Sequence, residues 1–152
     1  MKSDILKGWT NYLNKNQYNF SVDKKGEVIS FQGIHNYVDG VCSYEVKVGD
    51  NNYRTYVELP VKVEESNLNQ ILDYIFLANA NPMFAHFTYD YETNNVFCVH
   101  SSFCDSVPDD ETIKISINSA DAFLRAFYHG LKSVAEESLS AKEAYEKGFE
   151  QH

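Results

Sequence analysis

The feature that most constrains the fold is a strict alternation of apolar and polar residues through two neighbouring segments. The apolar positions are Cys42, Tyr44, Val46 and Val48 and, after the turn Gly49–Asn52, Tyr53, Thr55, Val57 and Leu59. The polar positions between them are Ser43, Glu45, Lys47, Arg54, Tyr56 and Glu58. Successive side chains of a strand point to opposite faces of a sheet. The pattern therefore predicts an antiparallel pair with one buried and one wet face.

Two earlier segments have the same period. Tyr18, Phe20 and Val22 are the apolar positions of one, and Ile29 and Phe31 those of the next. A two-residue loop at 25–26 pairs Phe20 with Phe31 and Val22 with Ile29, which keeps both apolar rows on one face. Residues 34–40 interrupt the pattern and are expected to form a connecting loop. Pro60 lies late in its strand and indicates a strand end or a sheet edge.

Two stretches carry apolar residues three and four positions apart, which places them on one face of a helix. The first helix, with Ser3 as the expected N-cap and an end near Asn16, has the stripe Ile5, Leu6, Trp9, Tyr12 and Leu13, with Trp9 a core residue. The second, from an N-cap at Ser66 to a stop at 79–82, has the stripe Leu68, Ile71, Leu72, Ile75 and Phe76.

The stretch from Phe84 to Phe103 has the form of a hairpin around the turn 93–95, and it is apolar on both faces. One face offers Phe87, Tyr89, Tyr91, Val96, Cys98 and His100; the other offers Phe84, His86, Phe97, Val99 and Phe103. Such a hairpin is covered on both sides, or it reserves one face for a partner.

A long helix is expected after an acidic loop. Ile113, Ile115 and Ile117 alternate, which predicts a short seventh extended segment before that helix. The helix itself is expected to begin at Ser119 and to bury Phe123, Phe127, Leu131 and Val134. Ser140 and Glu143 match a capping box, so residues 138–152 are expected to form a kinked or projecting helical tail.

Together these elements predict a single α+β domain over residues 1–152. Its order is α-β-β-β-β-α-β-β-(β)-α, with an antiparallel sheet of about six to seven strands packed against three main helices. A chain of 152 residues is long enough to bury one real core.

The polar residues do not form a recognisable catalytic or metal site. The five histidines are His35, His86, His100, His129 and His152. An odd-sum register of the hairpin, such as Tyr89 opposite His100, points His86 and His100 to opposite faces. Cys98 and His100 share a face but are too far apart along a strand to form a nucleophile–base pair. We expect no metal, no cofactor and no catalytic residue.

The composition limits the classes of partner that the chain can bind. Thirteen basic residues face 22 acidic ones, for a formal charge of −9, and only Arg54 and Arg125 are arginines. Nucleic acid needs clustered Lys and Arg, so it is an unfavourable partner. No apolar run is long enough to span a membrane. The acidic N-terminal start and three cysteines, Cys42, Cys98 and Cys104, an odd number, favour a cytoplasmic location.

Three short stretches carry a resemblance to known proteins. Residues 77–81 end a helix on Asn, residues 84–90 form a strand ending in Asp, and residues 95–99 form a hydrophobic strand after a turn. This order resembles the fold shared by type III secretion chaperones and YbjN-like proteins, with an additional early strand pair and a charged tail. The resemblance implies a bacterial, non-enzymatic protein, often a homodimer, that binds another polypeptide as a chaperone or a regulator.

The aromatic content supports an interface, because Tyr and Phe together number 21 and aromatic residues are enriched where proteins meet. The candidate protein-interface residues lie in the middle helix and the hairpin: Ile71, Ile75, Phe84, Phe87, Tyr89, Tyr91, Phe97 and Phe103. The alternative hypothesis is a small-molecule-binding or enzymatic α+β domain with a pocket between the sheet and the C-terminal helix.

Overall fold

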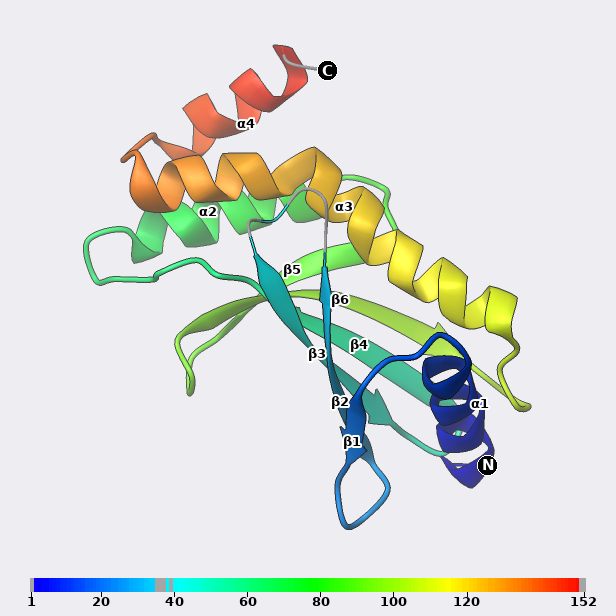
Figure 1. Ribbon diagram of the computed structural model, residues 1–152. Coiled ribbons are helices and arrows are strands. Elements are labelled where there is room, and N and C mark those ends of the chain that lie inside the picture. The colour runs from blue at the N-terminus through cyan, green and yellow to red at the C-terminus, as the bar shows by residue number, and fades with distance from the viewer. Residues whose placement is uncertain (1, 35–37, 39, 151–152) are drawn as a thin grey trace.

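A computed structural model describes residues 2–34, 38 and 40–150 of the chain (Figure 1). These residues form α1 (Lys2–Lys15), β1 (Phe20–Val22), β2 (Val28–Ile34), β3 (Val41–Val48), β4 (Asn52–Glu58), α2 (Leu68–Asn79), β5 (Ala85–Asp90), β6 (Asn95–Phe103), α3 (Asp110–Glu136) and α4 (Ala141–Glu150). The α+β class expected from the sequence is confirmed. The expected 34–40 connection falls mostly on 35–37 and 39, which lie outside the described residues, and Ile34 belongs to β2.

The strands form one sheet in the order β1-β2-β3-β4-β6-β5, and every neighbouring pair is antiparallel. The predicted registers of the early hairpins are confirmed, since Phe20 lies opposite Phe31 and Val22 opposite Ile29. The loop between β1 and β2 is longer than two residues, because β2 begins only at Val28. Pro60 follows the end of β4 and therefore marks a strand end rather than an edge.

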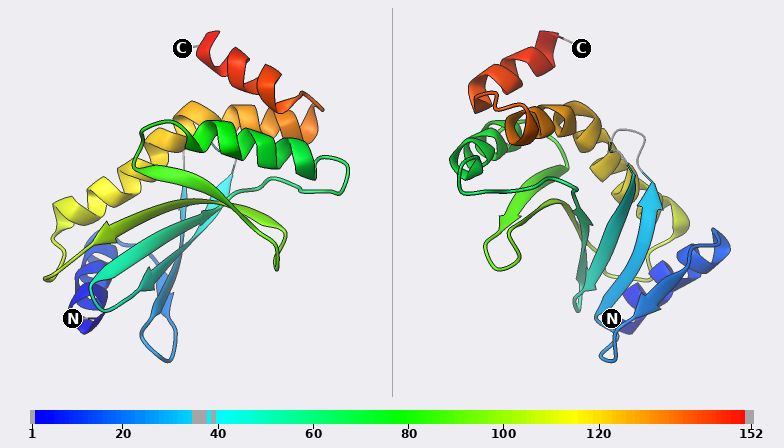
Figure 2. Two further views of the ribbon diagram at one scale, coloured as in Figure 1. Left: turned by 180° about the vertical axis from the view of Figure 1, so that it is seen from behind. Right: turned by 60° about the vertical axis from the view of Figure 1, so that its left-hand side comes forward.

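All helices of the described residues lie on one side of the sheet (Figure 2). We call the covered side the inner face and the opposite side the outer face. α2 and α3 pack over β5 and β6, α1 packs against β3 and α3, and α4 packs on α2 and α3. The core lies between the inner face and the helices, and its largest fully buried side chains include Trp9, Tyr53, Tyr74, Phe87, Phe123, Leu124 and Leu131.

The predicted start of α3 and the predicted seventh strand are wrong. α3 begins at Asp110, and residues 113–117 are helical. The Asp109 side chain accepts a hydrogen bond from the Thr112 backbone N–H at 2.8 Å, which caps the helix much earlier than Ser119. Ile113 is fully buried, whereas Ile115 is exposed. The three alternating isoleucines therefore lie in a helix, with Ile113 in the core, Ile117 at its margin and Ile115 in solvent.

The helix starts predicted at Ser3 and Ser66 are also wrong. α1 already includes Lys2, and the N-cap of α2 is Asn67. The Asn67 amide accepts from the Glu64 N–H and donates to the backbone oxygens of Lys62 and Ala135. It therefore joins the loop before α2 to the end of α3, a long-range role that local capping rules do not reveal.

The buried stripe of α2 differs from the expected one at two positions. Phe76 was expected to be buried but is 77% exposed, and Tyr74, which was not in the expected stripe, is buried. The Tyr74 hydroxyl donates to the Phe127 carbonyl oxygen at 2.9 Å and lies against Gly130. A Cβ atom at position 130 would meet that hydroxyl at 2.1 Å. Glycine is therefore needed where the Tyr74 side chain of α2 lies against α3.

The C-terminal segment forms a helix of its own, as the capping box predicts. Ser140 Oγ accepts from the Glu143 N–H at 3.2 Å, and α4 begins at Ala141. Ala141 and Ala144 are buried on α2 and α3. Residues 141–148 thus pack on the domain instead of projecting from it.

The Asn79 side chain protects the free edge of β5. Its amide donates to the Phe87 carbonyl oxygen at 2.9 Å, and its carbonyl accepts from the Phe87 N–H at 2.8 Å. The side chain thus takes the hydrogen-bonding place of a further strand at this position. An edge covered in this way is a poor site for strand addition.

Candidate outer-face binding site

The outer face of the sheet carries no helix in the described part of the chain, so its side chains are the ones that meet solvent or a partner (Figures 1 and 2). The strand registers align its residues in rows that cross the sheet. One row runs through all six strands and consists of Ser21, Ser30, Glu45, Tyr56, Val99 and His86. The next consists of Gln32, Ser43, Glu58, Phe97 and Thr88.

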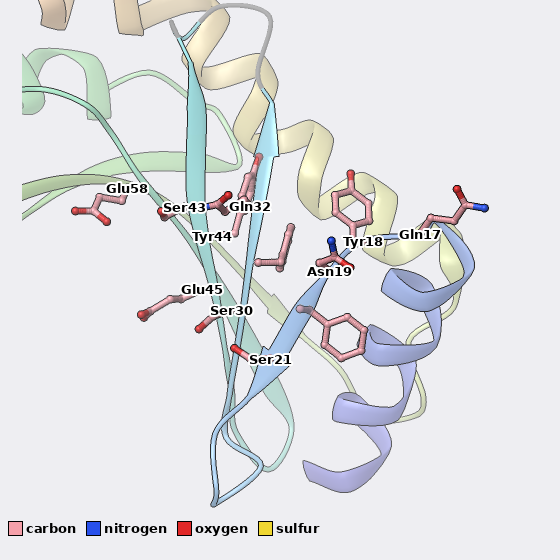
Figure 3. Close-up of a pocket in the computed structure, with 12 residues that line it drawn as sticks. Gln17, Tyr18, Asn19, Ser21, Ser30, Gln32, Ser43, Tyr44, Glu45 and Glu58 are labelled. Carbon is pink, nitrogen blue, oxygen red and sulfur yellow. The ribbon is translucent and has the colours of Figure 1, made fainter.

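A hollow of about 790 Å³ lies over the β1–β4 part of this face. Its lining combines polar residues of β1–β4 with Phe20, Phe31 and Tyr44 of the inner-face row, and Figure 3 shows Ser21, Ser30 and Glu45 on the same side of their strands. Tyr18 and Asn19, from the segment between α1 and β1, also line it, and Figure 3 shows them on the α1 side of β1. The hollow is therefore wide and open, and it offers both hydrogen-bonding groups and apolar area.

A second hollow of about 720 Å³ lies over β3, β4, β6 and the turn between β5 and β6. Its lining includes Lys47, Tyr56, Thr88, Tyr89, Asp90, Tyr91, Glu92, Thr93, Asn95 and Phe97. Ser43, Glu45 and Glu58 line both hollows. The two are therefore parts of one depression, which we call the outer-face groove.

Carboxylates dominate the charge of the groove. Glu45 has no hydrogen bond or ion pair within the described residues, and Glu58 accepts one hydrogen bond, from Asn95 Nδ2 at 2.8 Å. Hydrogen bonds from the Thr93 hydroxyl and the Glu92 backbone N–H lower the pKa of Asp90 below its usual value. Asp90 is therefore ionised at neutral pH.

Aromatic rings form the floor and the rim of the second hollow. Tyr56 and Phe97 meet edge to face with ring centroids 6.1 Å apart, and Tyr89 and Tyr91 do so at 4.9 Å. The Lys47 ammonium lies 4.7 Å from the centre of the Tyr56 ring, within cation–π range. The groove therefore combines apolar area with places where a cation is favoured.

The predicted interface residues divide into two groups. Ile71, Ile75 and Phe87 are buried in the core, so they cannot contact a partner in this conformation. Five remain available at the surface: Phe84, Tyr91 and Phe103 are exposed, and Tyr89 and Phe97 are half-buried. Of these five, Tyr89, Tyr91 and Phe97 line the outer-face groove.

Glu45, Tyr56 and Glu58 are functional candidates that the sequence pattern does not reveal. They fall on the solvent-exposed side of an alternating strand pair, where polar side chains are expected. One signal was present, because Tyr56 is a large aromatic in that otherwise polar row. Only the pairing of β4 with β6 brings Tyr56 beside Phe97 and so reveals the groove.

The thiol and imidazole groups of the hairpin serve packing. Burial raises the pKa of the Cys98 thiol, which therefore stays protonated. His100 Nδ1 is hydrogen-bonded to the Phe84 carbonyl oxygen at 2.9 Å, and His86 lies on the other face, as the register parity predicted. Within the described residues, no three His, Cys, Asp or Glu side chains are placed to hold a metal ion. His35 and His152 lie outside those residues.

The space between sheet and α3 is occupied largely by side chains. Phe87 and Phe123 meet there with ring centroids 4.8 Å apart, and Phe123 meets Phe127 at 4.9 Å. A cleft of about 180 Å³ lies at one edge, between β2, β3 and the first half of α3. That volume is below the range of about 300–1,000 Å³ typical of small-molecule sites. The described helices include none that is long and apolar enough to cross a membrane.

Comparison with known proteins shows the fold. No protein-family model matches the chain, and no curated protein is significantly similar to it. Four chains of solved structures match. One is the crystal structure of YbjN from E. coli, a proposed transcription regulator, at 12% identity and a TM-score of 0.55. The match covers 96% of this chain and 93% of that one. The YbjN-like fold expected from the sequence is therefore confirmed.

Proposed function

We propose that this chain is a non-catalytic, polypeptide-binding protein of regulatory or chaperone-like type, which binds its partner in the outer-face groove. The observation that carries the proposal is the groove itself, where exposed and half-buried aromatic side chains line a sheet face that no described helix covers. Aromatic residues bury large rigid areas at interfaces, and a long open depression suits a polypeptide better than a small molecule.

Three further observations support a non-enzymatic role. The Cys98 thiol is kept protonated, His100 is bonded to the backbone, and the described carboxylates of the groove line an open depression instead of an enclosed cavity. General acid–base catalysis needs a side chain whose pKa lies near the working pH and which is within reach of a reacting atom. YbjN, described as a proposed transcription regulator, has the same fold, which favours a regulatory role.

The experiment is co-purification from the source organism with two variants of matched exposure. Tyr91 on the groove rim is 78% exposed and Phe76 on α2 is 77% exposed. Tyr91→Ser should remove the bound polypeptide, whereas Phe76→Ser should retain it. Equal loss with both variants, or retention with both, would contradict a groove-specific partner.

We further propose a homodimer formed by α2 and the residue just before β5. Phe76 in α2 is 77% exposed, Phe84 before β5 is 85% exposed, and α2 packs beside β5. Two large exposed rings in this part of the surface favour self-association. Light scattering at micromolar concentration should give twice the 17.4 kDa chain mass, and Phe76→Ser with Phe84→Ser should lower it. A monomer mass for the unmodified protein would exclude this dimer.

A further inference from the structure

The outer-face groove also has features that specify the chemistry of its occupant, an inference that rests on the proposed function. We infer that the groove binds an extended, basic polypeptide segment in which arginine or lysine side chains share one face with apolar side chains.

The charged side chains of the groove are mostly negative. The second hollow contains the carboxylates of Glu45, Glu58, Asp90 and Glu92 and a single ammonium, that of Lys47. The first hollow adds no other charged residue to the shared Glu45 and Glu58. Two of the carboxylates have spare capacity, because Glu45 is without a partner among the described residues and Glu58 accepts only one hydrogen bond. A basic occupant supplies the missing donors.

The carboxylates are separated by apolar area. Glu58 lies opposite Phe97 in one cross-strand row, and Glu45 lies opposite Tyr56 in the next. Asp90, Tyr91 and Glu92 follow at the β5–β6 turn. A segment that crosses these strands therefore meets carboxylates, then aromatic rings, then carboxylates again.

The Tyr56 ring already makes a cation–π contact with a side chain of the same chain. Lys47 Nζ lies 4.7 Å from its centre, so a cation at this ring is already compatible with the geometry. A guanidinium group suits the site better than an ammonium group, because it is planar, stacks on aromatic rings and binds carboxylates with two hydrogen bonds.

The length of the groove fits an extended segment. Neighbouring strands lie about 4.8 Å apart, so the row from β1 to β5 spans about 24 Å, which about seven extended residues would cover. Alternate side chains of such a segment point toward the sheet. Nucleic acid is disfavoured by the same carboxylates, which would repel its phosphates.

The test measures fluorescence anisotropy of labelled eight-residue peptides with the full chain. The probe repeats arginine, serine, valine, serine, so that one face of the extended peptide alternates arginine and valine. Two matched peptides replace arginine by glutamine or by glutamate. The arginine peptide should bind at least about tenfold more tightly than the glutamine peptide, and the glutamate peptide should not bind.

Two charge-matched double variants locate the binding. Glu45→Gln with Glu58→Gln changes the groove, and Glu65→Gln with Glu146→Gln makes the same charge change at exposed positions outside both hollows. The first should weaken the arginine peptide about tenfold and the second less than about twofold. Equal weakening by both would show attraction to the net charge alone and would overturn the inference.

Other outcomes separate this inference from the proposed function. If the glutamine and arginine peptides bind equally and Tyr91→Ser weakens both, the groove binds apolar segments: the proposed function stands and the basic partner is excluded. If no peptide binds while Tyr91→Ser still removes the cellular partner, the inference again fails alone. If no peptide binds and Tyr91→Ser leaves the cellular partner in place, both fail.

Discussion

The two faces of the sheet are built from the same strands but differ in what covers them. On the inner face, Phe87 and Val57 are buried beneath helices, and apolar rows from neighbouring strands meet one another. On the outer face, Tyr56 and Phe97 are only half-buried, and carboxylates lie between the aromatic rings. One strand pattern can therefore supply both the core and a surface for binding, because alternation assigns each residue to one face.

The largest expected effect comes from equivalent truncations on the two faces. Phe87→Ala removes a fully buried ring and should lower the free energy of unfolding by about 3–5 kcal/mol. Phe97→Ala removes a half-buried ring and should lower it by about 1 kcal/mol. Urea denaturation measures both, and similar losses would contradict the division into a core face and a binding face.

The helices that cover the inner face are expected not to tolerate a larger side chain at Gly130, which the Tyr74 hydroxyl contacts. Gly130→Ala places a Cβ atom 2.1 Å from the Tyr74 hydroxyl, so overpacking should lower the free energy of unfolding by about 1–3 kcal/mol. Gly148→Ala is the control, because a Cβ there has no neighbour within 4 Å, and alanine should stabilise α4 by about 0.5–1 kcal/mol. Thermal unfolding of both variants would show whether the signs differ as expected.

The edge of β5 gives an intermediate effect. Asn79→Ala removes two hydrogen bonds to the Phe87 backbone and should lower the free energy of unfolding by about 1–2 kcal/mol. It also frees an edge position for pairing between chains, so we expect greater aggregation at high concentration. Asn19→Ala, in the segment before β1, is the control. If Asn79→Ala were as stable and as monodisperse as this control, Asn79 would have no protective role.

The smallest expected effect is a pH dependence on the outer face. Desolvation, with the Arg54 guanidinium and the His100 ring as smaller electrostatic causes, lowers the pKa of His86 below its ordinary value of 6.5. The unfolded chain therefore binds more protons than the folded one in the window just below pH 6.5, and stability falls as the pH is lowered through it. His86→Gln should make the urea midpoints at pH 5.5 and 7.5 more similar, and an unchanged difference would contradict this contribution.

The sequence predicted the sheet well because its registers depend on local alternation. The β1–β2 pairing and the buried rows of β3 and β4 follow from period-two spacing and short turns. The predicted start of α3 was wrong because Ile113, Ile115 and Ile117 alternate as residues of a strand would. Only their packing on the core shows that Ile113 is the buried one. Exposure of Phe76 and burial of Tyr74 likewise depend on the approach of α2 to Gly130, which is far away in sequence.

The groove was less predictable than the fold. Tyr89, Tyr91 and Phe97 were expected at an interface, and the structure places them along one depression. Glu45 and Glu58 join them only because β4 pairs with β6, a strand about forty positions further along the chain. Such cross-strand neighbours follow from tertiary pairing and leave no local signature.

The most direct test of the central claim is site-specific photo-crosslinking in the source organism. A benzophenone amino acid in place of Tyr91 samples the outer-face groove, and the same group in place of Phe76, with nearly equal exposure, samples α2. We expect the Tyr91 position to capture a different polypeptide and the Phe76 position to capture only a second copy of this chain. Capture of the different polypeptide at Phe76 and not at Tyr91 would contradict it.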